Sequence, residues 1–348
     1  MEDRIKTLPP PSSWSRIYLI HILLVAVILS PRFVCARDQS ALAWPSAPLP
    51  PRISYEKEFS SAHELGIKDS AFRKFLRFVF GSDGNEGIIV QPINIHKDAE
   101  GKLYVVDVAM RAVHIFDIHG NQYHQINNAG HQDLRSPVDV EVSPNGSIYI
   151  SDSELGAVFV FDSSHKYQFT IKGYFTRPTG LAWKDDKLYV VDTGMHKILV
   201  FNKDGVLLNE IGRRGIGTGE FNYPISMTAR DQMYVNDALN FRIQTINTKS
   251  GLATAFGKQG DAQGTLNRSK GIAVDSENNI YVSDALFNVF QIFNSAGQLL
   301  LVVGSPGRNP GEFQMPNGIH IDAQDQIYVC DSLNGRIQIF QYHKVAEK

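Results

Sequence analysis

Two histidines and a glutamate lie at one repeated position of the sequence, and together they could bind a metal ion. The position falls four residues after the proline that opens a short strand-like segment, and it is occupied by His96, Glu141 and His320. Imidazole nitrogens and carboxylate oxygens are zinc ligands, and three of them leave a fourth position for water. Such a site would support a metal-dependent lyase or hydrolase. In the alternative, each side chain faces a neighbouring segment and is satisfied there by hydrogen bonds.

A second group of side chains could bind an acidic ligand. Basic residues gather in the glycine-rich loops of the second half of the chain. Lys270 and Asn317 each stand at the position after the one that proline usually takes. Loop lysines and arginines attract anions through a field that salt weakens, although solvated loops also carry such residues freely. The candidate ligand-binding residues are Lys270, Asn317, Arg213, Arg214, Lys258, Arg268 and Arg308.

Other motifs point to structure, and no residue is assigned to catalysis. The loop Gly212-Arg213-Arg214-Gly215 is followed by a strand-like segment, whereas a phosphate loop needs a helix behind it and usually Gly-Lys-Ser/Thr. Apolar residues return at a fixed place after these loops, which indicates connections plugged by an apolar side chain. The plugs are Phe221, Leu266 and Phe313. The sequence contains neither a nucleophile elbow nor a Cys-x-x-Cys motif.

A repeat that runs through most of the chain must position these side chains. Six times, an aliphatic residue, a tyrosine, an apolar residue and a variable residue precede an aspartate, at intervals of about 45 residues. Four short strands fit each interval, and this pattern is typical of a propeller blade. We therefore predict an all-β, six-bladed β-propeller in which the aspartates cap turns. They are Asp107, Asp152, Asp192, Asp237, Asp284 and Asp331.

Closure of the ring needs a strand from outside the last repeat. The repeat ends at Tyr342 without a fourth strand, and residues 53–60 alternate apolar and polar side chains, so we assign them to the closing strand. Residues 69–80 place large apolar side chains at helical spacing and predict a short inserted helix. Its basic face would allow it to lie on a membrane or dock a partner, but packing on the propeller is favoured. The segment 78–81 also resembles a blade-end strand, so the two assignments could be exchanged.

The repeat resembles the NHL repeat, whose phrases run Pro-x-Gly-Ile-Ala-Val-Asp, Ile-Tyr-Val-x-Asp and Asn-x-Arg-Ile-Gln-x-Phe. The last repeat matches nearly throughout, with Pro316-Asn317-Gly318-Ile319 and Arg336-Ile337-Gln338-Ile339-Phe340, whereas the first two carry Ala112 and Ala157 in place of the arginine. The resemblance covers roughly residues 53–343 and implies the six-bladed NHL-like fold. The chain looks like the exported bacterial members of the family. For these members the fold implies binding to other molecules instead of one fixed reaction.

The family also supplies two rival functions. Its relatives include peptide-amidating lyases with a zinc in the channel, and the metal-dependent alternative above corresponds to them. Some cytoplasmic NHL domains bind RNA, but the formal charge of −2 in this chain provides no bulk positive field, so nucleic acid is not expected as a partner.

The N-terminus predicts export. Basic residues precede an apolar run over residues 17–30, and Val34-Cys35-Ala36 offers small residues for cleavage. The run is shorter than the roughly 20 residues of a membrane-spanning helix. We expect a cleaved signal, with an uncleaved membrane anchor as the alternative. The predicted organisation is a signal or anchor at 1–36, a Pro-rich linker at 37–52, the propeller at 53–343 and a tail at 344–348.

These observations favour a non-catalytic protein, exported to the periplasm or the extracellular space, that binds a protein or an acidic small ligand on one propeller face. No cofactor is expected. A divalent metal held by His96, Glu141 and His320 belongs to the alternative, a lyase or hydrolase with its site in the central channel. Residues 17–30 or the 69–80 helix would mediate any membrane association.

Overall fold

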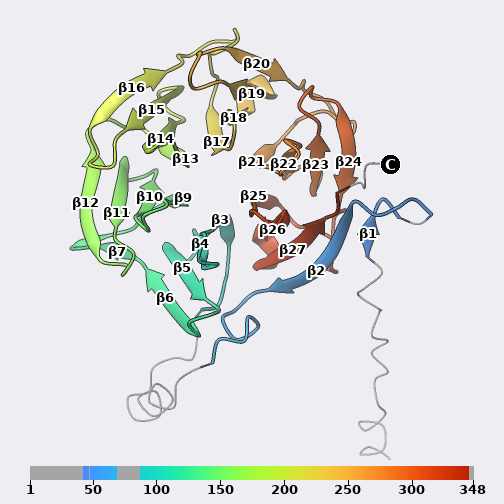
Figure 1. Ribbon diagram of the computed structural model, residues 1–348, viewed down its shortest axis with the longest axis horizontal. Helices are drawn as coiled ribbons and strands as arrows, with labels where there is room; N and C mark the ends of the chain where they lie inside the picture. The colour runs from blue at the N-terminus through green and yellow to red at the C-terminus, as the bar shows by residue number, and fades with distance from the viewer. Residues whose placement is uncertain (1–41, 47, 69–86, 345–348) are drawn as a thin grey trace, which may run out of the picture. The chain divides into compact units, whose positions relative to one another are not determined.

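The computed structural model describes residues 42–46, 48–68 and 87–344, all of which lie in one compact unit, Ser40–Lys348. These residues form six antiparallel sheets arranged as blades around a central channel (Figure 1). The first strand of each blade lines the centre of the ring, and the last strand lies at its rim. The predicted six-bladed all-β propeller is therefore confirmed.

Each blade contains four strands in chain order from the centre outward, except the last. Blades 1 and 2 contain β3 (Pro92–Lys97), β4 (Leu103–Asp107), β5 (Ala112–Asp117) and β6 (Gln122–Ile126), then β9 (Pro137–Val142), β10 (Ile148–Asp152), β11 (Ala157–Phe161) and β12 (Tyr167–Lys172). Blades 3 and 4 contain β13 (Pro178–Lys184), β14 (Lys187–Asp192), β15 (Lys197–Phe201) and β16 (Leu207–Ile211), then β17 (Pro224–Ala229), β18 (Met233–Asp237), β19 (Arg242–Ile246) and β20 (Ala253–Phe256).

Blade 5 contains β21 (Ser269–Val274), β22 (Ile280–Asp284), β23 (Val289–Phe293) and β24 (Leu299–Val303). Blade 6 contains β25 (Pro316–Ile321), β26 (Gln326–Asp331), β27 (Arg336–Tyr342) and the N-terminal strands β2 (Ile53–Phe59) and β1 (Ala43–Trp44). Two short strands, β7 (Asn128–Ala129) and β8 (Gln132–Asp133), pair between blades 1 and 2, and 3-10 turns η2 (Ala238–Asn240) and η3 (Ser332–Asn334) follow β18 and β26.

The core lies between neighbouring blades. Strands such as β10 and β11 are buried along their whole length, because each blade packs a neighbour on both faces. One cluster, for example, joins Val106 and Ile115 of blade 1 to Val140 and Phe159 of blade 2. Continuous apolar runs are therefore needed where an open sheet would alternate.

The six repeated aspartates cap turns, as predicted. All six are fully buried. In blade 3, the Asp192 carboxylate accepts hydrogen bonds from the backbone N–H of Thr176 at 2.7 Å and of Met195 at 2.9 Å. Each aspartate thus ties the loop before its blade to the turn after its strand. The predicted plugs are also buried, since Phe221, Leu266 and Phe313 have no exposed surface.

The N-terminal strand closes the ring. β2 pairs with β27 from Ile53 opposite Tyr342 to Phe59 opposite Ile337, so the predicted closing strand is confirmed. β1 then pairs with β2 as a fifth strand. Part of the predicted 37–52 linker therefore lies along blade 6.

Two faces of the propeller are named here by what they carry. The loop face carries the connections from each outer strand to the next inner strand, including residues 212–223, 257–268 and 304–315. It also carries the turns that follow the six capping aspartates. The turn face, at the other end of the strands, carries the turns between the first and second strands, such as residues 98–102 and 322–325. Inner strands begin at the loop face and end at the turn face.

Several predictions fall outside the described residues. They are the signal or anchor at 1–36, the helix at 69–80, the exchangeable strand at 78–81 and most of the tail at 344–348. In the part of the chain that the structure describes, no helix combines the length and apolar character needed to cross a membrane.

Candidate functional site

The inner strands line the channel in two layers. The layer nearer the loop face is narrow, because its glycines let neighbouring strands approach backbone to backbone. A Cβ atom at Gly180 would lie 2.8 Å from the Cα of Ser226, and one at Gly318 would lie 2.6 Å from the Cα of Asn94. A side chain would not fit at either glycine, so the inner strands lie close together in this layer. Its members are Asn94, Asp139, Gly180, Ser226, Gly271 and Gly318.

Asp139 joins three blades within this layer. Its carboxylate accepts a hydrogen bond from the Asn94 amide of blade 1 at 2.6 Å and another from the Leu181 backbone N–H of blade 3 at 2.7 Å. Burial raises the pKa of Asp139 to about 7, although hydrogen bonds from Leu181 and Val140 oppose the shift. Asp139 is not among the site residues predicted from the sequence.

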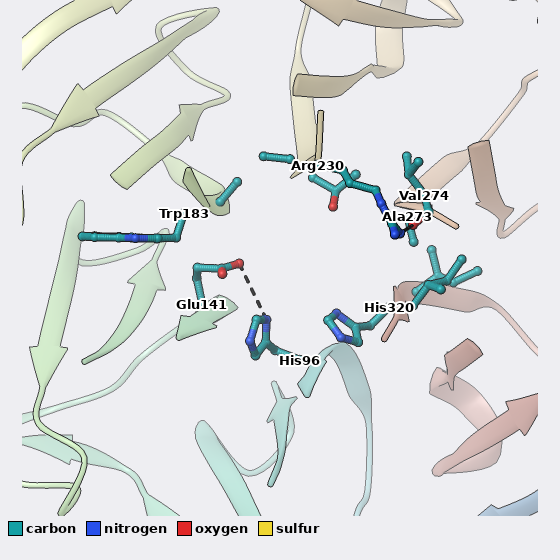
Figure 2. Close-up of a pocket in the computed structure, with 12 residues that line it drawn as sticks. His96, Glu141, Trp183, Arg230, Ala273, Val274 and His320 are labelled. Atoms are coloured by element: carbon teal, nitrogen blue, oxygen red, sulfur yellow. Dashed lines mark hydrogen bonds and ion pairs between the residues drawn. The ribbon is translucent and has the colours of Figure 1, made fainter. Parts of the chain in front are cut away.

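The second layer opens toward the turn face and contains the predicted histidines and glutamate. His96 of β3, Glu141 of β9 and His320 of β25 occupy one side, whereas blades 3 to 5 contribute the small side chains Ala182, Thr228 and Ala273. The asymmetry leaves a pocket of about 150 Å³ at the end of the channel. Figure 2 shows the three polar side chains converging on this space from adjacent blades.

His96 contacts the other two polar side chains, and the Glu141 carboxyl also accepts backbone hydrogen bonds from Val142 and Trp183. Nδ1 of His96 lies 3.6 Å from Oε2 of Glu141, and the rings of His96 and His320 have centroids 4.9 Å apart. Burial lowers the pKa of His96 to about 4 and that of His320 well below its usual range, and it raises the pKa of Glu141 well above its usual range. Burial therefore favours the uncharged form of each of the three groups.

A metal ion does not fit this arrangement as it stands. Among the residues that the structure describes, no group of three or more His, Cys, Asp or Glu side chains is arranged to hold one. A metal site would also need the Glu141 carboxylate ionised, which its surroundings oppose. The predicted trio is thus brought together, but as a polar pocket wall.

Two residues that the sequence analysis missed complete the pocket. Arg230 follows β17, and Trp183 lies near the end of β13, where its ring stacks on Tyr149 with centroids 5.3 Å apart. Figure 2 shows Arg230 on the opposite side of the pocket from His96. Its guanidinium donates a hydrogen bond to the Val274 carbonyl at 3.4 Å, and within the described residues it forms no ion pair.

A larger cleft borders the pocket between blades 6 and 1. It has a volume of about 650 Å³, and His320 and Ile321 line both spaces. Lys97 is fixed at its wall, because its ammonium donates to Asp322 at 2.7 Å and to the Tyr328 hydroxyl at 2.9 Å. Volumes of this size accommodate small organic molecules.

The predicted basic residues lie at the other end of the channel. They belong to the loop face and do not join the pocket of His96. Arg213 pairs with Glu220 at 2.7 Å, whereas Lys270 is half-buried and its pKa is lowered by burial and by the nearby Arg268 and Arg177. The side chains of Arg214, Lys258, Arg268 and Arg308 are exposed, and the Asn317 carbonyl accepts from Ser283. Their role in ligand binding stays a prediction.

Comparison with known proteins agrees with this architecture. A family model described as a 6-bladed beta-propeller (DUF5128) matches residues 175–242 and 270–344. A streptogramin B lyase structure aligns with a TM-score of 0.56 and 12% sequence identity, over 73% of this chain and 94% of that chain. Catalytically inactive virginiamycin B lyase from Staphylococcus aureus, in a structure with quinupristin, aligns with a TM-score of 0.54 and 13% identity, over 75% and 97%.

A structural genomics protein of unknown function from Bacteroides thetaiotaomicron aligns with a TM-score of 0.60 and 16% identity, over 84% of this chain and 76% of that chain. At such identities the likeness concerns the fold alone, because one propeller fold hosts many functions. The chain is a six-bladed β-propeller, similar in fold to virginiamycin B lyase and to NHL-type propellers.

Proposed function

We propose that this propeller is a binding protein that receives a small anionic organic ligand on its turn face. The acidic group of the ligand meets Arg230, and its neutral polar part faces His96, Glu141 and His320. The observation that carries the proposal is the pocket itself, where the largely buried side chains of His96, Glu141 and His320 face Arg230, which has no acidic partner among the described residues. Buried polar groups are normally hydrogen-bonded, and a ligand would supply hydrogen bonds to the two imidazoles, which make none among the described residues.

The size of the site also supports a small ligand. The pocket alone holds only a group about as large as benzene, so the remainder of the ligand extends past His320 into the cleft between blades 6 and 1. The proposal keeps the predicted binding on one face but moves it from the loop face to the turn face. It assigns no reaction, and it is preferred to the metal-dependent lyase or hydrolase because burial opposes the ionised Glu141 carboxylate that a metal ion would need.

The test is ligand-induced stabilisation. The purified chain is heated with members of a panel of small carboxylates, sulfonates and phosphate esters, and the unfolding temperature is recorded. A compound that raises this temperature is then titrated against the wild type and Arg230→Gln. Because a charge-assisted hydrogen bond contributes about 1.5–3 kcal/mol, the variant should bind at least about tenfold more weakly.

A matched control separates the two faces. Arg268→Gln removes an exposed arginine from the loop face and should leave the affinity unchanged. If Arg268→Gln weakens binding and Arg230→Gln does not, the ligand binds on the loop face and the proposal is wrong. Stoichiometric zinc in the purified chain, lost from His96→Gln and His320→Gln variants, would instead favour the metal-dependent alternative.

Export is proposed from the sequence and has its own test. The basic start, the apolar run at 17–30 and the Val34-Cys35-Ala36 segment support a cleaved signal. N-terminal sequencing of the expressed protein should find Arg37 first. Recovery of Met1 from membranes would instead favour the uncleaved anchor.

A further inference from the structure

Four apolar side chains project from equivalent turns on the loop face. Each lies in the turn between the second and third strands of its blade, two or three residues after the aspartate that caps this turn. Met110 of blade 1 and Leu239, Leu286 and Leu333 of blades 4 to 6 have exposed fractions of 43%, 51%, 51% and 58%. These four, called the tip residues here, belong to blades that are consecutive around the ring (Figure 1).

The backbone holds the tip residues in place. The N–H of Leu239 donates to the Asn222 carbonyl at 3.0 Å, and the N–H of Leu333 donates to the Gln314 carbonyl at 3.1 Å. In the other two turns, the carboxylate of the capping aspartate accepts a hydrogen bond from the backbone N–H of the tip residue. These hydrogen bonds fix the turns to the blades. The fold does not need an apolar side chain at the exposed tip of such a turn.

Basic side chains surround the tip residues on the same face, and much of the acidic charge there is engaged. Glu220 pairs with Arg213, and the Glu312 carboxylate accepts hydrogen bonds from the backbone of Arg308 and Asn309. Glu154 pairs with Arg135, whereas Asp133 and Asp261 remain exposed. Basic residues of this face include Arg111, Arg135, Arg177, Arg213, Arg214, Lys258, Arg268, Lys270 and Arg308.

The turn face also exposes apolar residues, but in an acidic setting. Val206 and Leu252 are 55% and 74% exposed in its outer turns. Its inner turns contain the carboxylates Asp98, Glu100, Asp185, Asp186, Asp231, Asp275, Glu277, Asp322 and Asp325 against the cations Lys97, Lys102, Lys184, Lys187 and Arg230. Among the described residues, the exposed apolar tips of the loop face therefore have the more basic surroundings.

We propose that the loop face docks onto an anionic lipid bilayer, with the tip residues entering the interface and the basic side chains meeting the headgroups. Buried apolar area and attraction to anionic lipid together determine binding of this kind. The tips are separate side chains on separate turns, and the three leucines are each followed closely by an asparagine, Asn240, Asn288 or Asn334. A fluid interface accommodates such separate insertions, whereas a protein partner would need a contiguous patch. The ligand pocket opens on the opposite face and stays accessible.

The first experiment measures binding of the purified chain to vesicles. Vesicles of equal parts phosphatidylglycerol and phosphatidylcholine should bind it, phosphatidylcholine vesicles should bind it more weakly, and salt should reduce the difference. The triple variant Leu239→Ser, Leu286→Ser and Leu333→Ser should bind at least about tenfold more weakly, because each leucine removed withdraws apolar surface from the interface. The control Val206→Ser with Leu252→Ser should bind like the wild type.

The apolar run at residues 17–30 could bind vesicles by itself, so a second measurement reports on the loop face alone. An environment-sensitive dye is attached at Leu239→Cys or, as the control, at Leu252→Cys, with Cys35 replaced by Ser. Cys330 is buried and should not react. A blue shift at position 239 with vesicles, and none at position 252, is the expected result. Equal spectra at both positions, or equal binding of the triple variant and the wild type, would overturn the proposal.

Discussion

At the scale of single residues, burial determines the character of the channel site. His96, Glu141 and His320 are held near one another by three inner strands, and burial shifts the pKa of each group toward its uncharged form. Uncharged imidazoles and a carboxylic acid can donate and accept hydrogen bonds without the large cost of a buried charge. The channel wall is thus suited to recognising the polar part of a ligand.

One consequence is a pH dependence that His96 imposes on stability. Its pKa is about 4 in the folded protein and about 6.5 when unfolded, so only the unfolded state takes up this proton as the pH falls below 6.5. The stabilisation is present above pH 6.5 and is lost toward pH 4, to an extent of roughly 3 kcal/mol. His96→Gln should therefore lose less stability than the wild type over that range, as measured by urea unfolding at several pH values.

Buried carboxyls affect the same curve with the opposite sign. The pKa of Asp139 is raised to about 7 and that of Glu141 is also raised, so their stabilisation is present at low pH and is lost as the pH rises. The wild type and the variant share both groups, so the difference between their curves reports on His96 together with its contact to Glu141. His131→Gln, at an exposed histidine, is the control. Parallel curves for His96→Gln and the wild type would contradict the assignment.

The sequence predicts the trio because the repeat fixes the offset of each member from the start of its strand. It could not predict Arg230 and Trp183 as partners, since these residues lie at strand ends, where turn length decides which side chain reaches the pocket. Arg213 is one of the predicted ligand-binding residues, and its pairing with Glu220 could not be predicted. That pairing depends on a loop conformation that residue spacing does not determine. Register is thus visible in a repeat, whereas loop contacts are not.

At the scale of elements, buried arginines connect strands to loops. Arg336 of β27 donates to Asp331 at 2.8 Å, to carbonyls of the loop before blade 6, and to Glu58 of β2 at 2.8 Å. Arg242 of blade 4 makes the corresponding contacts with Asp237 and its own loop, without a partner from another blade end. The same arginine–aspartate contact therefore stabilises a single blade at Arg242, whereas at Arg336 it also connects to the strand that closes the ring.

Replacing Arg336 tests this difference. Arg336→Met should destabilise the protein by about 3–5 kcal/mol, because the Asp331 carboxylate stays buried without its cation. Arg242→Met should have a similar cost through Asp237. Only the first variant should also increase hydrogen exchange of β2 amides, as measured by mass spectrometry. Equal exchange of β2 in both variants would show that Glu58 and Arg336 do not contribute to closure.

At the scale of the whole molecule, six similar units form a ring with two chemically different faces. The strand pattern predicted the blade number and the closing strand, because four strands per interval and an unpaired last repeat leave few arrangements. The charge difference between the faces could not be predicted in the same way. It depends on which turns project together, and turns that are distant in the sequence meet only in the ring.

Closure should determine the stability of the ring as a unit. A chain lacking residues 42–59 loses β1 and β2 and exposes the edge of β27 and the buried face of Phe340, which packs on Tyr55 with ring centroids 5.6 Å apart. We expect a lower unfolding temperature and a broader transition in calorimetry. An unchanged transition would mean that another segment completes blade 6.

The pairing of β2 with β27 also has a consequence for biosynthesis. β2 leaves the ribosome early, but its partner is among the last described strands to be made, so blade 6 stays incomplete until nearly the whole propeller has been translated. At about 5–20 residues per second that delay is on the order of tens of seconds. During this interval the nascent chain cannot form its closed ring, and it remains available to chaperones and to any translocation machinery that requires an unfolded substrate.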